Sequence, residues 1–397
     1  MLAMTQGDRS SATQANPAQW REPAPDIAID VRGVWKVFGA REHEAFAAIQ
    51  REGLNKAQVL QAFDCVVGVH DASFSVQRGE IFCLMGLSGS GKSTLLRHIN
   101  RLLEPTAGSV FVDGRDVMAL PEPELRTLRN RRIAMVFQDF GLMPHRSVLD
   151  NVAMALEIRG VPRNTRRAAA EKALAMVELT GWGARFAHEL SGGMQQRVGL
   201  ARAIAAEADI LLMDEPFSAL DPLIRRQLQG EFMRLAAVMK KTTVFITHDL
   251  EEAVRIGHRI AVMRDGVIVQ IGTPEQIVLA PTDAYVADFV SGISRLNLIR
   301  AHALMQPIAA YEQTHGAVPA DAAVMRDDAL LSELIACSVA NTDAAEGERS
   351  ASLIVVTDAL GARVGVVTRG DLLRAVVHHA VQRQASPTVE FFARPSD

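Results

Sequence analysis

An apolar segment that leads directly into a glycine-rich loop constrains the fold more than any other feature of this chain. Residues 80–85 read EIFCLM, which is typical of a strand buried in a parallel sheet. Gly86–Thr94 follows with the spacing GxxxxGK[ST], and Lys92–Asn100 continues as a predicted helix. A loop in this position points its backbone amides at a phosphate group. The sequence therefore predicts an α/β fold with a phosphate-binding loop.

The same loop specifies the predicted contacts with a nucleotide. We expect Lys92 to place its charge near the β- and γ-phosphates of ATP, and the Ser93 hydroxyl to ligate Mg²⁺. The residues predicted to bind ATP through this loop are Gly86, Ser88, Gly89, Ser90, Gly91, Lys92, Ser93 and Thr94.

A second apolar segment ends in two adjacent acids. Residues 210–213 read ILLM, and Asp214 and Glu215 follow them. Because ligands of open α/β sheets bind at the carboxyl ends of the strands, we expect both carboxylates beside the phosphate loop. The predicted role of Asp214 is to hold Mg²⁺, directly or through water. Glu215 is predicted to polarise the attacking water as a general base.

An octapeptide narrows the class of protein further. Leu190–Arg197 reads LSGGMQQR, which resembles the signature of the ABC ATPases. With the phosphate loop and the two acids, it makes residues 31–290 similar to that superfamily. The resemblance implies a P-loop NTPase domain of the α/β class, with a mainly parallel core sheet, an antiparallel β subdomain and a helical subdomain that carries the signature.

Other residues take their predicted roles from this resemblance. His248 matches a histidine that contacts the γ-phosphate, and Gln138 matches a glutamine that reaches Mg²⁺ and the attacking water. Phe38 matches the aromatic residue that stacks on adenine, with Trp35 as the alternative. The predicted catalytic residues are then Glu215, His248, Gln138 and Lys92, and the predicted Mg²⁺ ligands are Ser93, Gln138 and Asp214.

The signature implies that a second copy of the chain completes each ATP site. In the superfamily it contacts the ATP held by the phosphate loop of the partner, and here it comprises Ser191, Gly192, Gly193 and Gln195. Asp221 matches the D-loop, which runs across the interface between the two copies. One phosphate loop and one signature per chain therefore predict a head-to-tail dimer with closed twofold symmetry.

Several stretches resemble the ATPase subunits of importers for glycine betaine, proline and related quaternary amines. They include VWKVFG, GLNKAQVL, IAMVFQDFGLMPHRSVLDNV and DEPFSALDPLIRRQLQ. The resemblance implies an ATPase that energises import, together with integral membrane permease subunits and, indirectly, a solute-binding protein. It places the chain on the cytoplasmic face of the inner membrane. Choline or another small solute is the alternative cargo.

The composition of the chain agrees with a transport ATPase and disfavours nucleic-acid-binding and membrane-spanning proteins. The net charge is −4, which gives no field to attract nucleic acid, and no apolar run reaches the ~18–20 residues of a membrane span. Three widely separated cysteines form no zinc spacing or disulfide framework. A non-transport ABC ATPase acting on DNA or ribosomes is therefore disfavoured, and any membrane role requires a partner.

The chain divides into four predicted parts. Residues 1–25 lack the apolar core of a signal peptide and are predicted to be a disordered tail. Residues 26–295 form the ATPase domain, with a helical insert at about 41–64 and a helical subdomain at about 140–190. Residues 300–380 form a small α+β unit, and residues 381–397 are predicted to be a loose tail.

The C-terminal unit resembles a cystathionine-β-synthase-like (CBS) motif. Thr368 and Asp371 match the T-x-x-D of this motif, in which the threonine contacts the phosphate of a nucleotide and the aspartate contacts its ribose. Two alternatives remain at this point: a packing unit that binds no ligand, and a nucleotide sensor as the main role of the chain. Complete catalytic motifs in residues 31–290 argue against the second.

Overall fold

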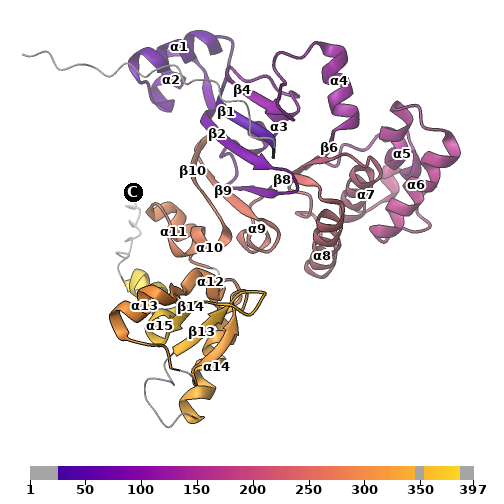
Figure 1. Cartoon of the computed structure of the whole chain (residues 1–397). Helices are drawn as coiled ribbons and strands as arrows, with labels where there is room; N and C mark the ends of the chain where they lie inside the picture. Colours follow the sequence, from indigo (N-terminus) through magenta and orange to yellow (C-terminus); the bar gives the residue numbers. More distant parts are fainter. Residues whose placement is uncertain (1–25, 293, 320, 345–352, 385–397) are drawn as a thin grey trace, which may run out of the picture.

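The computed structural model describes residues 26–292, 294–319, 321–344 and 353–384. The predicted N-terminal tail (1–25) and residues 385–397 of the predicted C-terminal tail (381–397) lie outside the described residues. A large cassette holds the motifs of the sequence, and a smaller C-terminal unit lies below it in Figure 1. Within the described part of the chain, no helix has both the length and the apolar character needed to cross a membrane.

A six-stranded, mainly parallel sheet forms the centre of the cassette, in the order β10-β9-β3-β8-β7-β6. Its strands are β3 (Ile81–Met85), β6 (Ile133–Val136), β7 (Ile210–Asp214), β8 (Thr242–Thr247), β9 (Arg259–Arg264) and β10 (Val267–Gly272). Only β10 runs antiparallel to its neighbour. Every residue of β3, β7 and β8 is buried, which explains their apolar sequences.

A second, antiparallel sheet shares a core with the phosphate-loop helix and has the strand order β2-β1-β4-β5. Its strands are β1 (Ile27–Phe38), β2 (Val66–Gln77), β4 (Ala107–Val112) and β5 (Arg115–Asp116). The insert predicted at 41–64 folds as two helices, α1 (Glu42–Glu52) and α2 (Lys56–Phe63). They pack on the end of β1 and form a small core of their own around Trp35 (Figure 1).

Helices surround the central sheet. They are α3 (Lys92–Ile99), α4 (Glu122–Arg131), α5 (Val148–Ile158), α6 (Arg163–Met176), the short η1 (Ala187–Glu189), α7 (Gly192–Ala205), α8 (Pro222–Met239), α9 (Leu250–Ile256), α10 (Pro274–Leu279) and α11 (Ala284–Val290). Three of them, α5, α6 and α7, pack together at one side of the cassette (Figure 1). This cluster is the helical subdomain that carries the signature.

The C-terminal unit has its own four-stranded sheet, in the order β11-β14-β13-β12, and its own core around Ile354 and Val367. Its elements are η2 (Arg295–Asn297), α12 (Ala301–Leu304), β11 (Gln306–Pro307), α13 (Ile308–His315), β12 (Ala323–Arg326), α14 (Leu331–Ala344), β13 (Leu353–Thr357), β14 (Arg363–Thr368) and α15 (Arg369–Gln384). Helix α15 continues through residues 381–384, which corrects the predicted start of the tail: this segment contains no glycine or proline to end a helix.

Candidate functional site

The parallel strands bring the predicted site residues to one edge of the central sheet. Gly86 follows β3, His248 follows β8, and Gln138 follows β6, while Asp214 ends β7. These four strands are parallel neighbours in the order β3-β8-β7-β6, so their carboxyl ends meet at the same edge. Residues separated by more than a hundred positions in the sequence therefore share one site.

The phosphate loop is held in shape by backbone that lies against two of its glycines. Gly91 has φ +97°, and a Cβ there would lie 2.3 Å from the carbonyl oxygen of Gly68 in β2. Gly86 has φ +151°, and a Cβ there would lie 2.1 Å from the carbonyl oxygen of Met263. Both positions exclude any side chain, because φ values of this sign disfavour L-residues and the space is already filled.

Lys92 is buried and is held by the loop that it serves. Its Nζ donates hydrogen bonds to the carbonyl oxygens of Gly86 at 2.8 Å and Leu87 at 2.9 Å. Burial lowers the pKa of Lys92, and the nearby carboxylates of Glu215 and Asp214 oppose that shift. The ammonium is thus fixed at the predicted position of the phosphates, beside the two acids.

Asp214 and Ser93 form a set of oxygens that suits Mg²⁺. Ser93 Oγ donates to Asp214 Oδ1 at 2.8 Å, and Asp214 is fully buried. Its other oxygen, Oδ2, has no hydrogen-bond partner among the described residues, and the Arg97 guanidinium is 3.9 Å away. Burial raises the pKa of Asp214. A buried carboxylate oxygen without a partner is costly, and a hard divalent cation satisfies such an oxygen.

Gln138 lies apart from this hydrogen-bonded pair in the bonding pattern of the described residues. It is exposed beyond β6, and within the described chain its side chain makes no hydrogen bond to Ser93 or Asp214. Its contact with Mg²⁺ stays a prediction.

Glu215 and His248 form a pair at the end of β7 and β8. The Nδ1 of His248 lies 3.1 Å from Oε2 of Glu215. The Glu215 side chain is only 16% exposed, whereas that of His248 is 59% exposed. One carboxylate is thus nearly withdrawn from bulk solvent and orientated by an imidazole that faces it. This is suitable geometry for accepting a proton from a water molecule.

Of the two aromatic candidates for adenine stacking, Phe38 is the accessible one. The residue is 39% exposed, and its ring packs on Gly68, whose carbonyl also lies against the phosphate loop. Trp35 is buried and stacks on His70, with ring centroids 4.1 Å apart. Trp35 therefore has a core role, and the geometry favours Phe38.

The signature occupies the exposed start of α7. Ser191 caps the helix, and its Oγ accepts from the amide of Met194 at 3.4 Å. The side chain of Gln195 turns back to its own chain, where its amide donates to the carbonyls of Ala187 at 2.9 Å and Leu190 at 3.2 Å. Asp221 caps α8 by accepting from the amides of Leu223 and Ile224.

The T-x-x-D pair of the C-terminal unit forms a reciprocal cap on α15. Thr368 Oγ1 and its amide donate to Asp371 Oδ2 at 2.6 and 2.9 Å, and the Asp371 amide donates to Thr368 Oγ1 at 3.2 Å. Arg374 donates to the other oxygen of Asp371 at 2.6 Å. These bonds lower the pKa of Asp371 against the opposing effect of burial. The pair has a structural role whether or not it also meets a ligand.

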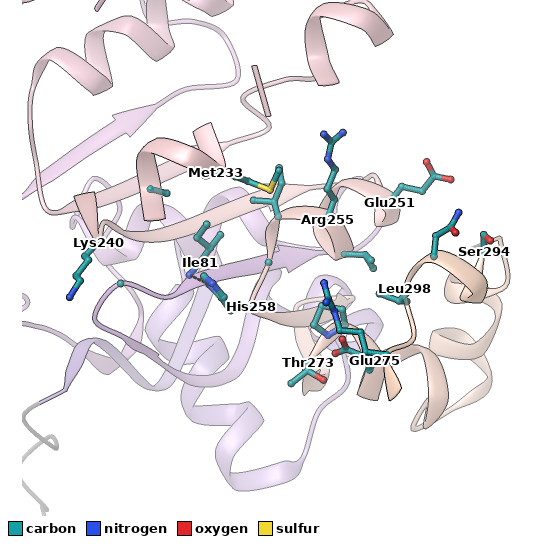
Figure 2. A pocket seen from close by; sticks show the side chains of 18 of the residues that line it. Ile81, Met233, Lys240, Glu251, Arg255, His258, Thr273, Glu275, Ser294 and Leu298 are labelled. Carbon is teal, nitrogen blue, oxygen red and sulfur yellow. Dashed lines mark hydrogen bonds between the residues drawn. The ribbon is translucent and has the colours of Figure 1, made fainter. Parts of the chain in front are cut away.

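A large cavity lies away from this site. It has a volume of about 1290 Å³ and is located between the cassette and the segment that enters the C-terminal unit (Figure 2). Ile81, His258 and Leu298 are among its lining residues. Ile81 begins β3, and Gly86 follows the end of the same strand. The cavity and the phosphate loop are therefore separated by the length of β3, at about 3.3 Å per residue.

Two residues that contact the site carry no obvious signal in the sequence. Gly68 lies in β2, and its carbonyl sets the position of Gly91. Gln196 lies on the buried face of α7, where its amide donates to the carbonyl of Glu215 at 3.0 Å. A polar residue on the buried side of a helix is the only signal that marks Gln196 in advance.

Comparison with known proteins agrees with this site. A model of the ABC transporter family matches residues 69–218. The glycine betaine/proline betaine transport system ATP-binding protein ProV of Salmonella typhimurium is 47% identical over 76% of this chain and 76% of its own. The trimethylamine N-oxide transport system ATP-binding protein TmoW of Ruegeria pomeroyi is 50% identical over 70% of this chain and 81% of its own.

A solved structure shows the same fold. The ATP-binding cassette MJ0796, described as a dimer bound to ADP and Pi, is 30% identical, with a TM-score of 0.53 over 62% of this chain and 98% of that one. The P-loop NTPase cassette predicted from the sequence is confirmed, whereas a CBS-like C-terminal domain stays a prediction. This chain belongs to the ATP-binding subunits of ABC transporters.

Proposed function

We propose that this chain hydrolyses ATP to energise an importer of glycine betaine or a related quaternary-amine osmolyte. The observation that carries the proposal is the Glu215–His248 pair beside the buried Asp214, at the sheet edge that also holds Lys92. Relatives named as ATP-binding proteins of transport systems for glycine betaine, proline betaine or trimethylamine N-oxide support the class of cargo, since all three compounds are small and carry a four-substituted, methylated nitrogen. Choline is the alternative cargo, as in a choline transport ATP-binding protein that is 42% identical over 56% of this chain.

Each side chain at the edge has a separate task in hydrolysis. The amides of the phosphate loop and the Lys92 ammonium bind the β- and γ-phosphates, where negative charge develops. Glu215 accepts a proton from the attacking water, and His248 orientates its carboxylate and meets the γ-phosphate. Ser93, Asp214 and Gln138 would hold Mg²⁺, which when bound neutralises charge on the phosphate oxygens. Phe38 offers its exposed ring to adenine.

The working unit in this proposal is a pair of chains arranged head to tail. Ser191, Gly192 and Gly193 lie at the exposed start of α7, and a helix N-terminus of this kind suits the γ-phosphate of the partner's ATP. The D-loop Asp221 would lie at the interface. Gln195 supports this contact less, because its amide already donates to two carbonyls of its own chain.

The remaining partners follow from the transport role. Permease subunits would supply the membrane path, with a solute-binding protein delivering the cargo to them. The chain would then lie on the cytoplasmic face of the inner membrane, docked through the loop after Gln138. The C-terminal unit would regulate the pair, with Thr368 and Asp371 as the candidate ligand contacts if it is CBS-like.

Uptake of radiolabelled cargo tests the proposal. In cells lacking the gene, we expect the parental chain to restore glycine betaine uptake and the Glu215→Gln variant to fail. The purified variant should bind ATP but retain it in a stable dimer, because the proton acceptor is gone. Choline and trimethylamine N-oxide, assayed in parallel, identify the preferred cargo. Equal uptake of all three with and without the gene would refute the transport role, and parental hydrolysis by the variant would refute the role of Glu215.

A further inference from the structure

Glu215 adopts a backbone conformation that an L-residue avoids. Its φ is +48°, in the left-handed region, although it carries a full side chain. Such a conformation persists only where the surrounding structure determines it. The position of the carboxylate relative to His248 therefore depends on whatever holds this backbone.

Three hydrogen bonds converge on the carbonyl oxygen of Glu215. The amide and the hydroxyl of Ser218 donate to it at 3.3 and 3.1 Å, from within the same turn. The third donor is Nε2 of Gln196 at 3.0 Å, from helix α7. This last bond ties the Glu215 carbonyl to α7, whereas the Glu215 amide donates to the carbonyl of Ile246 in β8 at 3.1 Å.

Gln196 uses both ends of its side chain on the same loop. While Nε2 donates to Glu215, its Oε1 accepts from the amide of Ala219 at 3.1 Å. The residue is 1% exposed, so neither bond competes with bulk water. One side chain thus fixes both ends of the turn from Glu215 to Ala219, just before the D-loop Asp221.

We propose that Gln196 is a positioning residue that makes the orientation of Glu215 depend on helix α7. The inference rests on the proposed role of Glu215 as general base. Ser191–Gly193 begin the same helix, about 4.5–7.5 Å along its axis from Gln196 at 1.5 Å per residue. A γ-phosphate bound there, on the partner's ATP, therefore acts through a rigid helix on the base of the other site. Gln196 itself touches no substrate.

Substitution by methionine tests the proposal, because methionine has a similar length and cannot make either strong hydrogen bond. Gln229→Met is the matched control: Gln229 is also a buried glutamine on a cassette helix, but its Nε2 donates to Glu252 at 2.7 Å. We expect Gln196→Met to lower the kcat of the full chain at least tenfold, with KM for ATP and affinity for ADP changed less than threefold. Gln229→Met should keep kcat within threefold at a similar loss of thermal stability.

The outcomes separate this inference from the proposed function. If Gln196→Met keeps the parental kcat, the inference is wrong. It is also wrong if Gln196→Met loses both kcat and nucleotide affinity and Gln229→Met loses both to the same extent. If Glu215→Gln abolishes hydrolysis while Gln196→Met retains it, only the positioning role fails. If Glu215→Gln hydrolyses ATP at the parental rate, the proposed general base fails as well.

Discussion

Replacement of Gly91 by alanine should show that contact with β2 shapes the phosphate loop. The new Cβ would lie 2.3 Å from the carbonyl oxygen of Gly68, closer than real Cβ contacts come, so the loop or the strand must move. The φ of +97° adds a conformational cost of about 1–3 kcal/mol, and overpacking adds about 1–3 kcal/mol. We therefore expect a loss of about 2–6 kcal/mol in the free energy of unfolding.

Gly89→Ala separates the two contributions. Gly89 lies in the same loop with φ +78°, but a Cβ there has no atom within 4 Å. This substitution should cost only the conformational term, about 1–3 kcal/mol. Gly53→Ala, with φ +67° in equally open space at the end of α1, measures the same term far from the site.

The assay is urea unfolding of the nucleotide-free chain, followed by binding of a fluorescent ADP analogue. Gly91→Ala should unfold at the lowest urea concentration of the three variants and should lose at least tenfold in affinity for the analogue. The affinity falls because displaced loop amides no longer converge on the phosphates. Equal stability of Gly91→Ala and Gly89→Ala would refute the argument that the Gly68 carbonyl restrains the loop.

Three further predictions concern other parts of the molecule. Phe38→Ala should weaken ATP binding about tenfold, since stacking on an aromatic ring contributes about 1–3 kcal/mol per base, and Trp35→Phe should leave ATP binding unchanged. Equal affinities of the two variants for ATP in a fluorescence titration would contradict the assignment of Phe38. Burial lowers the pKa of His98 from 6.5 to about 4, so the unfolded chain takes up the proton first and stability falls as the pH drops below about 6.5. In urea unfolding, the free energy of unfolding should fall by about 2–3 kcal/mol between pH 7.5 and 4.5, and the His98→Gln variant should lack this fall. The same pH dependence in parent and variant would show that His98 is not its source. Thr368→Val should lower hydrogen-exchange protection of α15 by about 1 kcal/mol and leave ATP hydrolysis unchanged, whereas unaltered protection would show that the cap is dispensable.

Local patterns predicted the proposed catalytic edge because its residues lie at the ends of apolar strands. Met85, Asp214 and Thr247 all close fully buried segments, and parallel pairing requires such ends to meet. Gly68 and Gln196 follow no comparable rule. Their contacts join segments that are distant in sequence, and the packing of the two sheets and of α7 creates those contacts.

Motif spacing alone also left the role of Thr368 and Asp371 open. A ligand-binding T-x-x-D and a helix N-cap both place an acid three residues after a threonine, so the same letters satisfy two kinds of chemistry. The structure adds the start of α15 at Arg369 and the bonds between the two side chains. Aromatic candidates Phe38 and Trp35 were separated in the same way, by exposure rather than by sequence position.

The site concentrates features that are unfavourable in an isolated chain. Asp214 buries a carboxylate oxygen that has no hydrogen-bond partner in the described part of the chain, Glu215 has a left-handed backbone, and Lys92 keeps its ammonium under a loop against the effect of burial on its pKa. The fully buried strands β3, β7 and β8 hold these groups in place. A cost of about 1–3 kcal/mol for each group is small beside the free energy gained by burying the side chains of those strands. Because phosphates and a divalent cation would relieve the charges of Lys92 and Asp214 together, nucleotide binding should stabilise the cassette most at the edge where hydrolysis is proposed to occur.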